Sequence, residues 1–226
     1  MSKELEVFAD LDGRWIGGKS TSLIFGSRPL LLILAAVLNS DVGPTLYRAI
    51  FESLALAGGY LRVGPPQLEK FPLPKVVSAV KAGSNQSGDR ILNSILELSE
   101  RTVLLASRKV STQIEFLSEI EIALGGAGNR ARSGIVDGLA GKTRIYEFAG
   151  DENRGLPPIG IDELLSLLRR NAARLSVSVD APVARRKLDK ALIRNLKALE
   201  PMLRELSGNR RSIERLALQL YGLGEA

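Results

Sequence analysis

The stretch VARRKLDKALIRNLKALEPMLREL, residues 183–206, carries a leucine at nearly every turn of a helix. The leucines recur three or four residues apart, close to the seam of a coiled coil, so the stretch predicts a long amphipathic helix. The seam consists of Leu188, Leu192, Leu196, Leu199, Leu203 and Leu206. Pro201 lies inside the stretch and is expected to kink the helix.

A second long helix is expected over residues 89–124, with Asp89 as its N-terminal cap. Unbroken, it would be roughly 54 Å long at about 1.5 Å per residue. Ser107 and Ser111 are weak points, so two collinear helices are an alternative. Its apolar seam is Leu92, Leu96, Val103, Ala106, Val110, Leu117, Ile120 and Leu124. Two shorter helices are expected at 161–175 and 212–221.

The first third of the chain shows another pattern. Alternating apolar residues predict short strands over 5–25, and a further strand is expected at 60–63. Between them, helices are expected at 29–38 and 43–56. The mixture predicts an α+β protein.

Two domains follow from these elements: a small mixed α/β module over residues 1–82 and a coiled-coil-like scaffold of long helices over 83–226. The boundary is placed in the flexible polar stretch 83–88. A glycine-rich stretch at about 125–160 predicts a long loop or a small insertion within the scaffold.

Composition excludes several classes of chemistry. The chain has 226 residues and contains neither cysteine nor histidine. Disulfides, zinc fingers, thiol nucleophiles and histidine-based triads are therefore excluded. The N-terminal residues do not resemble a signal peptide, and the apolar run 30–38 is too short to span a bilayer. We expect a cytoplasmic protein without a membrane partner.

The basic residues gather toward the C-terminus. The net charge is +6, and residues 156–226 hold 13 basic against 8 acidic side chains. Arg186, Lys190, Arg194 and Lys197 share one helical face, opposite the leucine seam. This face has two interpretations: a stripe that contacts nucleic-acid phosphates, or the solvated outer face of a coiled coil.

One motif suggests nucleotide binding. GRWIGGKS, residues 13–20, satisfies the P-loop pattern, in which Lys19 would neutralise phosphate and Ser20 would hold magnesium. A P-loop must leave a strand and enter a helix, and the residues after Ser20 are poor helix formers. We prefer a chance match and keep a P-loop nucleotide-binding protein as an alternative function.

Four segments resemble a known family when taken in order. An apolar helix ends in Leu38-Asn39-Ser40, a glycine-rich segment GGYLRV follows at 58–63, and FPLP closes the block at 71–74. The fourth segment is IERLALQLYGL at 213–223. Together they resemble the TaqI-like C-terminal specificity domain of type IIG restriction–modification enzymes and adenine-specific DNA methyltransferases.

The resemblance implies a target-recognition domain that binds duplex DNA sequence-specifically. Its α/β module would read base edges, since arginine and glutamine can make bidentate contacts to guanine and adenine. Basic residues of the scaffold would anchor phosphates. The candidate DNA-binding residues are Arg14, Lys19, Arg48, Tyr60, Arg62, Gln67, Lys70, Arg186, Lys190 and Arg194.

The chain departs from the family because no methyltransferase domain precedes these segments. The resemblance therefore implies recognition without chemistry, as a specificity subunit or as the C-terminal piece of a split enzyme. No catalytic residue, metal site or cofactor is expected on this chain. S-adenosylmethionine is expected on a partner methyltransferase domain or subunit. A helical protein–protein interaction scaffold is a further alternative.

Overall fold

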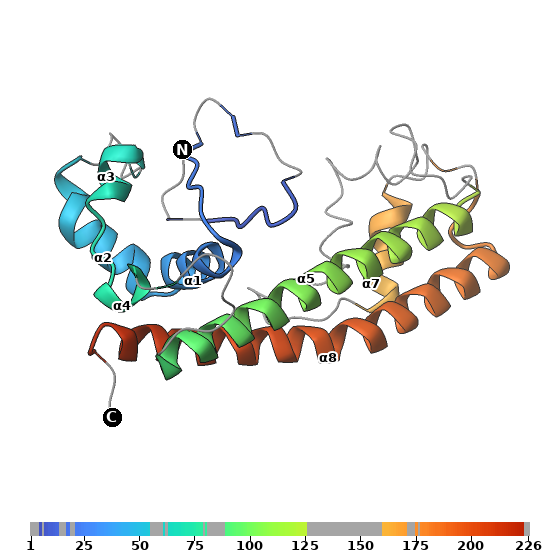
Figure 1. Ribbon diagram of the computed structural model, residues 1–226. Coiled ribbons are helices and arrows are strands. Elements are labelled where there is room, and N and C mark those ends of the chain that lie inside the picture. The colour runs from blue at the N-terminus through green and yellow to red at the C-terminus, as the bar shows by residue number, and fades with distance from the viewer. Residues whose placement is uncertain are drawn as a thin grey trace. The chain divides into compact units, whose positions relative to one another are not determined.

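The computed structural model describes residues 5, 7–13, 17–18, 21–54, 61, 63–78, 80, 89–125, 160–170, 175 and 177–223. In this part of the chain every regular element is a helix, and none is a strand (Figure 1). The predicted α+β class is therefore wrong, because the described residues form an all-helical structure. The expected scaffold of long helices agrees with the structure.

Two helices are much longer than the others: α5, Arg90–Ala123, and α8, Pro182–Leu220 (Figure 1). The short helices are α1 Arg28–Asn39, α2 Val42–Phe51, the 3₁₀ helix η1 Glu52–Leu54, α3 Pro65–Glu69, α4 Lys75–Ser78 and α7 Ile161–Arg169.

The helix expected over 89–124 is confirmed as one continuous helix, α5. The Asp89 carboxylate accepts hydrogen bonds from the backbone N–H groups of Ile91 and Leu92, at 2.8 and 3.1 Å, which caps the helix as predicted. Gly125 ends it with a φ of 88°, a backbone conformation that favours glycine.

Helix α8 is longer than predicted. The helices expected at 183–206 and 212–221 are one helix, with Pro201 inside it. A mid-helix glycine costs only about 1 kcal/mol relative to alanine, so Gly208 does not outweigh a seam that continues to Leu216 and Leu220. Gly222, with a φ of 69°, caps the helix as expected.

The chain divides into two compact units. Unit 1 comprises Met1–Val103 and Asn209–Ala226, and unit 2 comprises Leu104–Gly208. The division passes through both long helices, so each unit contains a part of α5 and a part of α8. The predicted boundary at 83–88 lies outside the described residues, and the predicted division into 1–82 and 83–226 stays a prediction.

The core of unit 1 forms between α1 and the beginning of α5. Ile33 and Val37 of α1 are fully buried against Leu92 and Ile95 of α5. The end of α8 adds partly buried apolar side chains to the same cluster, and Thr102 of α5 accepts a hydrogen bond from Asn209 of α8 at 3.3 Å. The two long helices therefore run antiparallel within this unit.

A second cluster in unit 1 surrounds Tyr47 of α2. Its ring lies 4.9 Å from the ring of Phe51 and stacks at 6.5 Å on that of Phe71, measured between centroids. Burial raises the pKa of Tyr47. The cluster is completed by Leu5, Leu38 and Leu61.

The residues predicted to form strands satisfy their backbone groups in another way. The Val7 N–H donates to Asn39 Oδ1 at 2.9 Å, and Asn39 Nδ2 donates back to the Val7 carbonyl at 2.8 Å. Ser22 Oγ donates to the Val63 carbonyl at 3.3 Å. At Val7 and Val63 a side chain thus takes the place of a neighbouring strand, and the described residues of these segments form no ladder.

Unit 2 has a core of three helix segments. Phe116 and Ile120 of α5, and Leu124 just past its end, pack with Leu188 and other apolar side chains of α8, all of them buried. Helix α7 supplies the third side with Leu164, Leu165 and Leu168, none of which is exposed to solvent. The predicted leucine seam of α8 is thus buried in this unit at Leu188, Leu192, Leu199, Leu203 and Leu206.

Helix α1 is apolar nearly all round, and six of its residues are buried. No single helix in the described ranges is long and apolar enough to cross a membrane. The pair formed by Arg28–Asn39 and Val42–Leu54 reaches that length and composition only together, with a bend of 73°.

Candidate nucleic-acid interface

The outward face of α8 in unit 2 carries a row of cations: Arg186, Lys190 and Lys197, called here the α8 cation row. Their spacing of four and seven residues places them on one side of the helix, opposite Leu188 and Leu192, whose side chains are buried. All three are exposed. Arg186 Nε donates to its own helix, at the Pro182 carbonyl, at 3.3 Å.

The cations of this row make no ion pair with any described carboxylate. The other arginines of α8 in unit 2 do. Arg194 pairs with Glu119 of α5, and Arg204 pairs with Glu200 at 3.0 Å within α8. Arg185 lies 3.5 Å from Asp162 of α7. The positive potential of α8 is therefore least compensated along the α8 cation row.

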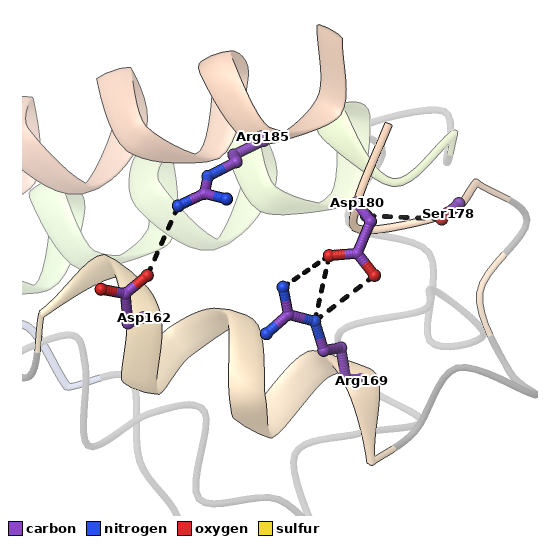
Figure 2. A network of polar contacts seen from close by, with 5 residues as sticks. All are labelled: Asp162, Arg169, Ser178, Asp180 and Arg185. Atoms are coloured by element: carbon purple, nitrogen blue, oxygen red, sulfur yellow. Dashed lines mark hydrogen bonds and ion pairs between the residues drawn. The ribbon is translucent and has the colours of Figure 1, made fainter. Parts of the chain in front are cut away.

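Figure 2 shows how the basic residues beside α7 are balanced by carboxylates. Arg169 at the end of α7 donates to Asp180 Oδ1 through Nη2 at 2.5 Å and through Nε at 3.0 Å. This hydrogen bond lowers the pKa of Asp180 and raises that of Arg169. Arg185 reaches from α8 toward Asp162 in the same view. Arg185 thus joins α8 to α7, and Arg169 joins α7 to the turn that precedes α8.

Among the predicted site residues of unit 1, Arg48 lies on α2 with an exposed side chain. Gln67 is half-buried in α3, and Lys70 is exposed just beyond that helix. Arg48 thus lies on another helix than Gln67 and Lys70, whereas the predicted residues Arg186, Lys190 and Arg194 share one face of α8. The remaining candidates lie outside the described residues: Arg14, Lys19, Tyr60 and Arg62.

Segments that carry the family resemblance meet through hydrogen bonds inside unit 1. The Asp41 N–H, just past the Leu38-Asn39-Ser40 segment, donates to Glu214 Oε1 of the C-terminal segment at 2.7 Å. Tyr221 Oη donates to the Pro72 carbonyl at 2.9 Å, which ties the C-terminal segment to FPLP. Together with the Asn39–Val7 exchange, these bonds are called here the unit 1 clips.

Each clip joins a side chain to the backbone of a segment far along the chain. Burial and the nearby Asp41 charge raise the pKa of Glu214, while its bond to the Asp41 N–H acts the other way. Burial raises the pKa of Tyr221 to about 12. Asn39, Glu214 and Tyr221 of these resembling segments therefore have structural partners.

The structure offers no support for the P-loop alternative. Residues 21–27, which would open the helix of a P-loop, are not helical, and α1 begins only at Arg28. Lys19 and Ser20 lie outside the described residues. Among the residues that the structure describes, no group of three or more acidic side chains is placed to hold a metal ion.

No family model, curated protein or solved structure matches this chain.

The sequence did not indicate which cations of α8 pair with carboxylates. The carboxylate that binds Arg194 is 75 residues away in the sequence, so no local pattern could indicate it. Nor did the sequence indicate that Glu214 and Tyr221 bind backbone groups of other segments. The spacing of Arg186, Lys190 and Lys197 did carry a usable signal, because positions four and seven residues apart share a helix face.

Proposed function

We propose that this chain binds duplex DNA as the non-catalytic specificity domain or subunit of an adenine-specific DNA methyltransferase or restriction–modification complex. The observation that carries the DNA-binding part is the α8 cation row, since its three cations are exposed and pair with no described carboxylate. The resemblance of the four sequence segments supports the assignment to a methyltransferase system.

The mechanism is phosphate anchoring followed by readout of base edges. Lysine and arginine that neutralise phosphates release condensed counterions, which makes binding favourable and salt-dependent. Phosphate contacts fix the register of the protein but carry no sequence information. Readout would come from unit 1, where Arg48, Gln67 and Lys70 are the described candidates. The methyl transfer would take place on the partner methyltransferase, which would bind S-adenosylmethionine.

The test is the affinity of the nuclease-treated chain for a fluorescent duplex of about 30 base pairs at fixed salt. A triple variant, R186Q/K190Q/K197Q, removes the α8 cation row. The matched control, R185Q/R194Q/R204Q, removes three charges from the same helix, all of which are paired with carboxylates. Both variants change the net charge equally, so any difference between them reports position.

We expect R186Q/K190Q/K197Q to bind the duplex at least tenfold more weakly, because each lost cation releases about one counterion fewer on binding. The control is expected to bind DNA within about threefold of the unmodified chain, because the charges that it removes are already compensated by carboxylates. Absent binding of the unmodified chain, or an equal loss in both variants, would contradict the proposal. Circular dichroism of each variant checks that its helix content is retained.

A further inference from the structure

The outer face of α5 in unit 2 carries an apolar stripe that no described residue covers. Leu104 is 61% exposed, Ile122 is 50% exposed and Ile114 is 38% exposed. Serines fill the positions between them at the same three- and four-residue spacing, so all lie on one helix face. The α5 stripe consists of Leu104, Ser107, Ser111, Ile114, Ser118 and Ile122.

The stripe is suited to being covered by protein. It contains no charged residue, although a quarter of the chain is charged. Ser111 Oγ donates to the Ser107 carbonyl at 3.2 Å, so this hydroxyl would not lose a hydrogen bond on burial. Small serines between large aliphatic side chains allow two helices to approach closely and interdigitate. Exposed apolar faces of this kind mark interaction sites.

We propose that the α5 stripe is a dimer interface that packs antiparallel against the same stripe of a second copy of this chain. The stripe is self-complementary: with Ser111 opposite Ile114 of the other copy, Leu104 lies within one residue of the level of Ile122. Large side chains near the two-fold axis thus meet small ones, as an isologous contact requires.

Charges beside the stripe select this occupant. Arg108 and Glu115 each follow a stripe residue by one position, so they lie on the same flank, one heptad apart. Both are exposed, and neither makes an ion pair with a described residue. In the antiparallel register Arg108 lies within one helical turn of Glu115 of the second copy. The two-fold axis forms this pair twice.

The test is sedimentation velocity of the full, nuclease-treated chain over a range of concentrations. A single-helix face is smaller than a standard interface, so we expect a weak dimer with a Kd on the order of 10 µM. L104D is expected to weaken it by at least about 30-fold, because the symmetric dimer would bury the new charge among apolar side chains twice. The control is I193D, which places the same charge on α8 at a residue that is 56% exposed; it should leave the dimer unchanged.

A charge swap tests the register. R108E and E115R are each expected to weaken the dimer by about tenfold, because each places like charges together twice. The double variant R108E/E115R restores opposite charges and should recover the original Kd. A chain that remains monomeric at about 500 µM, a dimer that survives L104D, or a swap that does not recover would overturn the proposal. Because all three residues are exposed, the variants should keep their helix content.

Discussion

Unit 1 and unit 2 each have an apolar helix core, but the long-range polar contacts inside unit 1 are mostly bonds from side chains to backbone, whereas those inside unit 2 are ion pairs. In unit 1 the unit 1 clips join side chains to backbone groups of segments that lie far apart in the sequence, and an ion pair, Arg28–Glu100 at 2.6 Å, adds to them. In unit 2 the polar contacts are ion pairs between charged side chains, such as Arg194–Glu119 and Arg169–Asp180, around a leucine-rich core. Unit 2 uses most of its α8 arginines in this way and leaves one row of cations uncompensated.

The comparison distinguishes two sets of residues. Those of unit 1 carry the sequence resemblance, and those of unit 2 are the ones that we propose to contact DNA phosphates. The clips involve Asn39, Glu214 and Tyr221, which stand within or beside the resembling segments and have structural partners. The α8 cation row lies in unit 2 and has none among the described carboxylates. Folding can therefore account for the resembling residues, and the phosphate contacts that we propose lie in unit 2.

The largest expected effect is the destabilisation of unit 2 by a cavity in its core. Leu188 is completely buried among α5, α7 and α8, so L188A removes apolar contacts and leaves a cavity. We expect a loss of about 2–5 kcal/mol in the free energy of unfolding. Hydrogen exchange should accelerate more in α7 than in α1, because α7 packs against this core. Equal acceleration in both helices would show that the two units do not differ in this way.

A second substitution, G43A, is expected to destabilise unit 1. A Cβ atom on Gly43 would lie 2.6 Å from the Leu38 carbonyl oxygen and 2.7 Å from the Leu38 Cα, both backbone atoms. G43A should therefore force α1 and α2 apart and cost about 1–3 kcal/mol, measured by urea denaturation. The control is G208A in α8, where a Cβ meets nothing within 4 Å. It should stabilise the chain by up to about 1 kcal/mol, and a loss in G208A as large as that in G43A would refute the packing argument.

The smallest expected effect concerns one of the unit 1 clips, the hydrogen bond of Tyr221. Y221F removes the hydrogen bond from Tyr221 to the Pro72 carbonyl and should cost about 1 kcal/mol. The folded-state pKa of Tyr221, about 12, lies above its ordinary value of 10.0. The contribution of Tyr221 to the free energy of unfolding is therefore complete below pH 10 and is lost as the pH rises through 12. In that range the unfolded chain releases the tyrosine proton more readily than the folded chain does.

Urea denaturation at pH 8 and pH 11 measures both terms of this prediction. The difference in stability between the unmodified chain and Y221F should shrink at the higher pH. A difference that is constant or grows with pH would contradict the assignment of Tyr221 as a partly buried hydrogen-bond donor.

The long helices could be predicted because their information is local. A cap at Asp89 and apolar residues at helical spacing identified α5 without knowledge of any distant contact. The strands predicted at 5–25 failed because alternation at Leu5 and Val7 does not reveal the hydrogen-bond partner. For Val7 that partner is a side chain 32 residues away, Asn39, and not a strand.

For the candidate site too, local features could be predicted from the sequence, and features that depend on packing could not. Helix periodicity placed Arg186, Lys190 and Arg194 on one face, which the structure agrees with. Periodicity could not show that Arg194 pairs with Glu119, since that contact depends on how α5 packs on α8 in unit 2. Nor could it show that the stripe Leu104, Ile114 and Ile122 stays exposed, because exposure depends on what the rest of the chain covers.

The most direct test of the DNA-binding account is the slope of the logarithm of duplex affinity against the logarithm of salt concentration. Each phosphate contact contributes about −0.9 to this slope. The account predicts that R186Q/K190Q/K197Q makes the slope shallower by about 3, while R185Q/R194Q/R204Q leaves it unchanged. Equal slopes for the two variants, or a salt-independent affinity of the unmodified chain, would contradict it.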